Sequence, residues 1–427
     1  AKEININAIF EEDYGLDDYS SKRKKALCWC FAILGLLPLL VYKYYNFLNY
    51  SITSLLESAG LHFELPGLNW AIPVGISFFT FQAVGYLLDV YHKRVPIEKN
   101  FLDYALFVSF FPQITSGPIS TAKDILPQFK KKQKFDYIQA RHGLLFLLWG
   151  LFIKSVIADR AGIYVDSVYS AIDSFPAINC LLASILYTLQ IYADFAGYSF
   201  MAVGVASLLG FKIVNNFKRP YLAASVTEFW RRWHISMGSW FRDYVYIPLG
   251  GSRRGTVRQI INIGIVWLLT GLWHGASVNF ILWGIYFGVI LMAEKAFILK
   301  WLVKIPKVFR RCYSYLIVTI SWILFACTKR AERIVFFKAL TGIGKKFVCD
   351  RESMYLMFSY LPLIAICFVA AAPFGKNIYS IIQKRSETRL TNASVAVFEI
   401  MLVTFGMFLS VVYLISSSYN PFLYFRF

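Results

Sequence analysis

The chain has 427 residues, of which 57% are hydrophobic and only 16% are charged. Soluble domains carry roughly 25% charged and ~45–50% apolar residues, so this composition excludes a soluble globular enzyme, a disordered chain and a disulfide-stapled secreted domain. The net charge of +19 comes from basic residues in short loops between apolar runs, a pattern that indicates cytoplasmic loops of a membrane protein and not nucleic-acid binding.

Runs without charge predict the membrane-spanning helices, because a bilayer core requires roughly 20 apolar helical residues. A polar segment, residues 1–25, precedes the first run. We therefore predict an all-α polytopic membrane protein in which residues 26–427 form a single membrane domain. The predicted spans are 26–42, 71–88, 101–119, 142–158, 175–211, 260–293, 313–328, 353–375 and 400–416. Two of them are interrupted by a charge, 101–119 by Asp103 and 142–158 by Lys154.

Two of these runs are too long for one span. A continuous helix over 260–293 would reach about 50 Å at ~1.5 Å per residue, whereas the hydrocarbon core is ~30 Å thick. We therefore predict that 175–211 and 260–293 each break or turn back at membrane depth. Irregular backbone at that depth is tolerated only inside protein or beside a water-filled cavity.

Each long run carries one ionisable side chain at the expected break. Asp194 precedes Gly197, and His274 lies between Gly271 and Gly275. Ionisable groups inside a membrane are costly and are commonly functional. For Asp194 the alternative is a structural polar group that holds two helices together, whereas the glycines around His274 favour a functional role.

The segment between the long runs predicts one amphipathic helix at the membrane interface. Ser225 and Glu228 form a Ser-x-x-Glu capping box, which marks a helix start, and the helix should end before Pro248. Apolar and aromatic side chains recur along one side at steps of three and four, as interfacial helices require. They are Val226, Phe229, Trp230, Trp233, Met237, Trp240, Phe241 and Tyr244.

The other side of this helix groups Arg231, His234 and Arg242. The two arginines are interpreted as substrate-binding residues or, alternatively, as contacts to lipid phosphates. His234 is interpreted as a second catalytic imidazole or as an interfacial residue.

The sequence predicts neither a metal centre nor a bound cofactor. No group of His, Cys, Asp and Glu has ligand spacing, and the chain has no Walker loop or Gly-x-Ser-x-Gly elbow. Broken helices bearing Asp194 and His274 are also typical of secondary transporters. A transporter is therefore the alternative to an enzyme, although no inverted repeat is evident.

Seven motifs follow one another along the chain. They are Phe111-Pro112-Gln113, Trp149-Gly150-Leu151-Phe152, Tyr192-Ala193-Asp194-Phe195-Ala196-Gly197, Asn216-Phe217-Lys218-Arg219-Pro220-Tyr221, Glu228-Phe229-Trp230-Arg231-Arg232-Trp233-His234, Ile247-Pro248-Leu249-Gly250-Gly251 and Gly271-Leu272-Trp273-His274-Gly275. In this order they resemble the membrane-bound O-acyltransferase family, and in particular its bacterial alginate and peptidoglycan O-acetyltransferase branch. The resemblance covers roughly residues 20–427. It implies a ring of tilted helices around a thin central membrane region, with a funnel from each side, in the bacterial cell membrane.

By this resemblance, His274 matches the family's signature catalytic histidine and His234 its second histidine. Such enzymes move an acyl group, usually from coenzyme A on the cytoplasmic side, to an acceptor hydroxyl outside. We therefore expect acetyl transfer toward a cell-surface polysaccharide or peptidoglycan, with D-alanyl transfer to teichoic acid as the alternative activity. Expected partners are acyl-CoA, membrane lipid and an extracytoplasmic SGNH-type transferase or esterase. The expected substrate-binding or coenzyme A-binding residues are Asp194, Arg231, Arg242, Trp273 and Arg426.

The C-terminal sequence, residues 420–427, also resembles this branch. The hydroxyl of Tyr424 is interpreted as a covalent acyl relay, with Arg426 stabilising the developing charge. The alternative is an aromatic interfacial anchor. Relatives usually begin with further hydrophobic spans, so we expect such spans to be missing ahead of residue 20 of this sequence.

Overall fold

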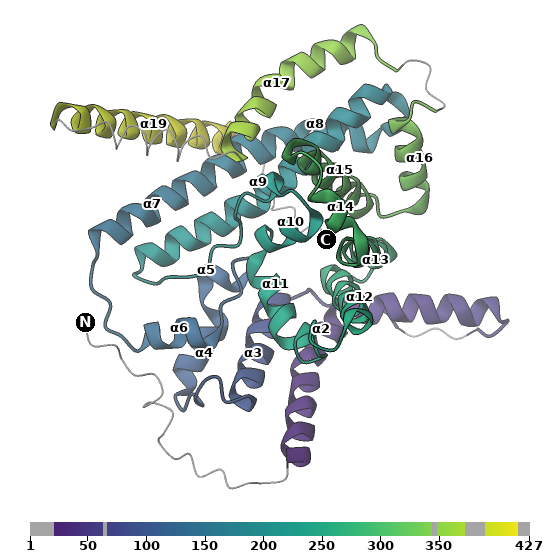
Figure 1. Ribbon diagram of the computed structural model, residues 1–427, viewed down its shortest axis with the longest axis vertical. Coiled ribbons are helices and arrows are strands. Elements are labelled where there is room, and N and C mark those ends of the chain that lie inside the picture. The colour runs from purple at the N-terminus through teal and green to yellow at the C-terminus, as the bar shows by residue number, and fades with distance from the viewer. Residues whose placement is uncertain (1–20, 63–65, 344–347, 372–388, 417–427) are drawn as a thin grey trace.

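The computed structural model describes residues 21–62, 66–343, 348–371 and 389–416 (Figure 1). Every regular element in these ranges is a helix, which confirms the all-α prediction. Within them, five helices are long and apolar enough to cross a bilayer, and the chain is a multi-pass membrane protein. These helices are Arg23–Ser58, Ala177–Leu208, Thr256–His274, Val278–Leu302 and Lys307–Ala326.

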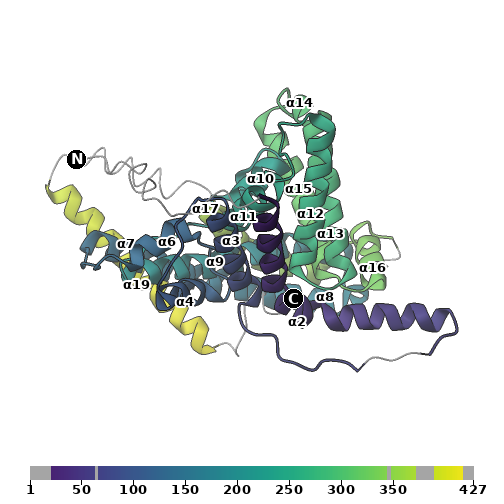
Figure 2. The same cartoon turned by 90° about the horizontal axis from the view of Figure 1, so that it is seen from below.

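The N-terminal part contains one long helix and several short ones. Helix α2 (Ser21–Ser58) includes Pro38, and its two halves run in different directions in Figures 1 and 2. The prediction of a single span over 101–119 is wrong, because the backbone of Phe110 leaves the helical region and ends α4 there. The other helices here are α3 (Ile76–Tyr91), α4 (Phe101–Ser109), α5 (Phe111–Ile114) and α6 (Ala122–Phe129).

Helix α9 (Ala177–Leu208) is continuous, so the predicted break in run 175–211 is wrong. The carboxylate of Asp194 lies 2.6 Å from Nζ of Lys154, which removes the electrostatic reason for a break. Gly197 serves close packing instead, since a β-carbon there would lie 2.9 Å from the carbonyl oxygen of Gly150. Helix α9 lies beside α7 (Tyr137–Phe152), which continues through the π-helical η1 (Ile153–Ala158) into α8 (Asp159–Ser170).

The predicted break in run 260–293 is confirmed. Helix α12 (Thr256–His274) ends where the backbone of Gly275 becomes extended, and α13 (Val278–Ala293) follows. The two helices lie side by side in both views (Figures 1 and 2). The remaining elements of this part are the π-helical η5 (Glu294–Ile298), α14 (Leu299–Leu302), α15 (Lys307–Ala326), α16 (Arg330–Leu340), α17 (Arg351–Ala371) and α19 (Arg389–Ser416).

The single amphipathic helix predicted after Ser225 is wrong. The chain forms α10 (Val226–Arg232), α11 (Ile235–Phe241) and the π-helical η4 (Arg242–Tyr246), with a break at Trp233 and His234. The aromatic side is not at a membrane interface, because it packs inside the protein. Trp233 contacts Trp322 of α15 at 5.2 Å between ring centroids, and Phe241 contacts Phe81 of α3 at 5.7 Å.

Candidate active site

The start of α10 is held by two carboxylates. The Ser225 hydroxyl accepts the amide of Glu228 at 3.0 Å, as the capping box predicts, while the Glu228 carboxylate reaches the amide of Ala224 at 2.7 Å. The second carboxylate is that of the fully buried Glu294 in η5. It accepts the amides of Val226 and Thr227 at 2.8 and 2.7 Å, and thereby joins α10 to the end of α13.

His234 follows α10 and occupies the left-handed backbone region, with φ of 45°. A non-glycine residue there is uncommon and requires support from its surroundings. Asn216 supplies that support: its carbonyl accepts the amide of Ile235 at 3.1 Å and its side-chain oxygen accepts the amide of Ser236 at 3.0 Å. The break therefore holds the His234 imidazole in a fixed direction.

The imidazole of His234 is 1% exposed and surrounded by aromatic rings. Ring centroids of Phe195, Trp273 and Phe78 lie 4.8, 5.9 and 6.4 Å away. Neither ring nitrogen has a hydrogen-bond partner among the described residues. Burial lowers the pKa of His234 to about 3, so the ring is neutral near pH 7.

His274 is the last residue of α12, and its ring, like that of His234, contacts the Trp273 ring. The Trp273 ring centroid is 5.0 Å from that of His274 and 5.9 Å from that of His234. Nε2 of His274 is buried with no partner among the described residues. The Lys43 ammonium donates to the Trp273 carbonyl at 2.6 Å, where the end of a helix carries partial negative charge.

A cavity of about 680 Å³, here called the main cavity, lies between α10, α11, η4 and α12. Its lining includes His234 and three cationic side chains, those of Arg231, Arg242 and Lys295. One face of α12 forms a wall, with Gln259, Ile263, Val266, Trp267 and Thr270.

The main cavity is directed along α12 toward His274. Residues three and four apart share one helix face, so His274 continues the stripe of Thr270 and Trp267 one turn further. His274 itself is not part of the cavity lining. The arrangement places His234 in the cavity wall and His274 outside the lining, one turn further along α12 than Thr270.

The structure brings most of the predicted site residues together. Arg231, His234 and Arg242 line the main cavity, although on separate short helices and not on one polar helix face. His274 and Trp273 do not line it and lie at the end of α12, beyond Thr270. Asp194 lies elsewhere, in a buried group in which Lys154 contacts both Asp194 and Asp159 at 2.6 and 2.8 Å.

Tyr424 and Arg426 lie outside the described residues, so their predicted roles stay predictions. Glu294 and Asn216, which position α10 and His234, are absent from the sequence-based candidates. The sequence feature that could have indicated Glu294 is its position as a single acidic residue at the end of an apolar run.

Comparison with known proteins identifies the family. A model of the membrane-bound O-acyltransferase family matches residues 94–336, which include both histidines and the whole main cavity. The chain belongs to this family. It is therefore a membrane-bound acyltransferase, and the transporter alternative is wrong.

This acyltransferase is similar to several bacterial enzymes. It is 32% identical over 411 residues to the probable alginate O-acetylase AlgI of Pseudomonas putida, covering 93% of this chain and 82% of the relative. The probable alginate O-acetylase AlgI of Pseudomonas syringae pv. tomato is 38% identical over 361 residues, 83% of this chain and 68% of the relative. The peptidoglycan O-acetyltransferase of Helicobacter pylori is 34% identical over 353 residues, 74% of this chain and 66% of the relative.

Proposed function

We propose that this acyltransferase moves an acetyl group from acetyl-CoA to a hydroxyl of a cell-surface polysaccharide or peptidoglycan. The observation that carries the proposal is the main cavity, which combines cationic side chains, a buried neutral histidine and a helix face that leads to His274. The similarity to alginate and peptidoglycan O-acetyltransferases supports the acetyl group and the class of acceptor.

The main cavity suits a long anionic thioester. Arg231, Arg242 and Lys295 supply charge-assisted hydrogen bonds of the kind that bind phosphates. The wall from Gln259 to Thr270 extends for about 16 Å along α12 at ~1.5 Å per residue, which leaves room for an extended pantetheine arm. Ser252 lines the cavity, and Arg253 follows it in the sequence. The two belong to a basic loop of the kind that lies on the cytoplasmic side.

His274 acts as the general base in this proposal. Its neutral imidazole takes the proton of the acceptor hydroxyl, and the oxygen attacks the thioester carbonyl to form a tetrahedral intermediate. The intermediate collapses with cleavage of the C–S bond, and the imidazolium returns its proton to the coenzyme A sulfur. The aromatic rings around His274, among them Trp283 at 4.9 Å and Phe325 at 5.5 Å, keep water from the thioester.

On the acceptor side, the proposal includes an SGNH-type extracytoplasmic partner that receives the acetyl group. In this proposal Tyr424 is the intermediate acceptor: its hydroxyl forms an acetyl ester, and the acetyl group is then passed on to the partner. Tyr424→Phe retains the aromatic ring and removes the nucleophile. Full acetyl transfer to the polymer by this variant would rule the relay out.

The function is tested by coenzyme A release from acetyl-CoA, measured with a thiol reagent on purified protein in lipid nanodiscs with acceptor oligosaccharide. We expect His274→Ala to lose about 10²–10⁴-fold in rate, the range typical of general-base catalysis. His142→Ala, on the exposed surface of α7, is the matched control and should retain wild-type turnover. Equal release by wild type and His274→Ala would refute the proposal, and turnover only with a D-alanyl-loaded carrier protein would favour D-alanyl transfer.

A further inference from the structure

A second cavity, of about 220 Å³, lies beside the main cavity. The two share Ser239 and Arg242 in their linings, so the end of α11 and the start of η4 border both cavities. The second cavity is further lined by Gln82 of α3, by Asp124 of α6 and by Asp243 of η4. Neither the motifs nor the proposed chemistry assigns it a role.

Gln82 is the side chain that points to a ligand. It is 3% exposed, and its amide nitrogen Nε2 has no hydrogen-bond partner among the described residues. A buried amide donor without a partner costs about 1–3 kcal/mol, and such groups in folded proteins require an explanation. Because Gln82 lines the cavity, a bound molecule with an acceptor atom would satisfy it.

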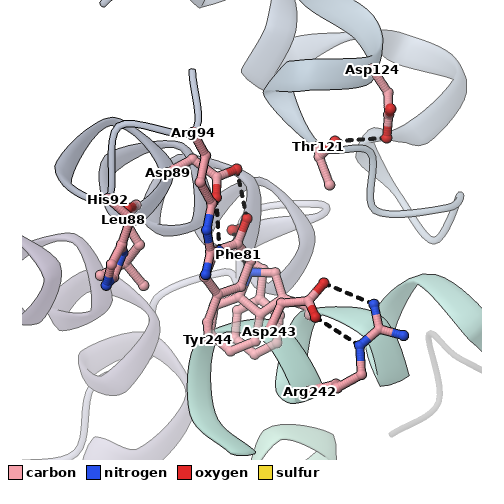
Figure 3. Close-up of polar contacts among 11 residues, drawn as sticks. Phe81, Leu88, Asp89, His92, Arg94, Thr121, Asp124, Arg242, Asp243 and Tyr244 are labelled. Carbon is pink, nitrogen blue, oxygen red and sulfur yellow. Dashed lines mark hydrogen bonds and ion pairs between the residues drawn. The ribbon is translucent and has the colours of Figure 1, made fainter. Parts of the chain in front are cut away.

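Two carboxylates in the cavity lining, those of Asp124 and Asp243, offer acceptors. Thr121 donates to one carboxylate oxygen of Asp124 at 2.7 Å, which orients that carboxylate at the exposed rim (Figure 3). Asp243 faces Arg242, with Nε–Oδ1 and Nη2–Oδ2 distances of 2.7 and 3.0 Å. This pair uses two of the five guanidinium N–H groups, so the other N–H groups of Arg242 can still bind an anion in the main cavity.

The charges of the second cavity disfavour an anion inside it. Arg242 is its only cationic lining residue within the described ranges. Tyr244, which also lines the cavity, donates to Asp89 at 2.8 Å, and Asp89 pairs with Arg94 at 3.2 Å (Figure 3). The Asp89 carboxylate therefore already has partners within the protein. An amide donor at depth and carboxylates at the rim fit a neutral, planar ring that carries both acceptor nitrogens and an amino group.

We propose that the second cavity binds the heterocyclic base of the donor, with Arg242 on the diphosphate between base and pantetheine. This inference rests on the proposed use of acetyl-CoA. Its volume equals about seven water molecules at ~30 Å³ each, enough for one base and too small for the whole donor. Gln82 donates to a ring nitrogen, and Asp124 accepts from the amino group, because both carboxylate oxygens of Asp243 already accept from Arg242.

The test compares acetyl-CoA with acetyl-pantetheine, which has the same thioester and lacks the nucleotide. In wild type, KM for acetyl-pantetheine should exceed KM for acetyl-CoA. Gln82→Met keeps the volume and removes the amide, so this ratio should fall about three- to tenfold, as expected for one hydrogen bond. Gln190→Met is the matched control, because Gln190 is buried in α9 and lines neither cavity, and it should keep the wild-type ratio.

Asp124→Ala serves as a second variant, since this exposed residue can be changed with little effect on folding, and the ratio should fall in it too. An unchanged ratio in folded Gln82→Met and Asp124→Ala, with both donors used, would overturn the base site while leaving acetyl-CoA as donor. If wild type uses neither donor, the donor assignment is wrong and the base site falls with it.

Discussion

Gly271→Ala is the most direct test of whether the α12–α13 contact positions His274. A β-carbon at 271 would lie 2.5 Å from the Phe280 carbonyl oxygen and 3.1 Å from Cα of Gly284. Ordinary C···O contacts are about 3.3–3.6 Å, so the helices must separate by roughly 0.8–1 Å. Overpacking of this kind costs ~1–3 kcal/mol. Because a shift of about 1 Å at a reacting group can cost ~10²-fold in rate, we also expect a large loss of turnover.

The matched control is Gly264→Ala, two turns earlier in α12. A β-carbon at 264 would meet only Sδ of Met292 at 3.7 Å, an ordinary contact. Both substitutions gain the same helix propensity, up to ~1 kcal/mol, so their difference in stability isolates the overpacking cost. Thermal unfolding and coenzyme A release would be measured on both in nanodiscs. Equal unfolding temperatures and equal rates for the two variants would refute the reasoning.

Three further predictions concern buried polar groups. Lys154→Met leaves the Asp194 carboxylate buried without its partner, so denaturant unfolding followed by tryptophan fluorescence should show a loss of about 3–5 kcal/mol; adding Asp194→Asn should recover part of it. Glu294→Gln weakens a charged cap of α10 and should cost about 1–2 kcal/mol in the same measurement, whereas an unchanged midpoint would show that the amides find other partners. The pKa of His234 is about 3 in the folded protein and ~6.5 in the unfolded chain. Burial of the neutral ring therefore makes its full contribution to the free energy of unfolding above pH 6.5. As pH falls below 6.5 the unfolded chain binds a proton that the folded protein does not, so the free energy of unfolding should decrease, by about 2 kcal/mol at pH 5. His234→Phe should show a correspondingly weaker acid dependence, and the same dependence as wild type would contradict the assignment.

The predictions that succeeded depend on local constraints. The break after His274 followed from the length of the run and the glycine at 275, both visible in the sequence. The sequence analysis also predicted that Arg231, His234 and Arg242 lie together, but for the wrong reason. One straight helix was expected to carry them, whereas the structure uses a left-handed residue at 234 to direct them into one cavity.

The predictions that failed depend on partners distant in the sequence. Helix α9 stays continuous because Lys154, 40 residues from Asp194, neutralises that carboxylate. Gly197 had suggested a break, yet its lack of a side chain serves contact with Gly150. The cap of α10 also depends on a residue distant in the sequence, since Glu294 is 68 residues from Val226. Hydropathy and helix periodicity contain no information about such pairings.

The π-helical turn η4, from Arg242 to Tyr246, has a consequence for how this region can vary. Such a turn accommodates one residue more than an α-helical turn. Because the extra residue is taken up within the turn, deleting one residue there would let η4 rewind as an α-helical turn without rotating the chain on either side. Homologous enzymes would therefore tolerate a difference of one residue between His234 and the loop at 250–255 while the elements on either side of η4 keep their places.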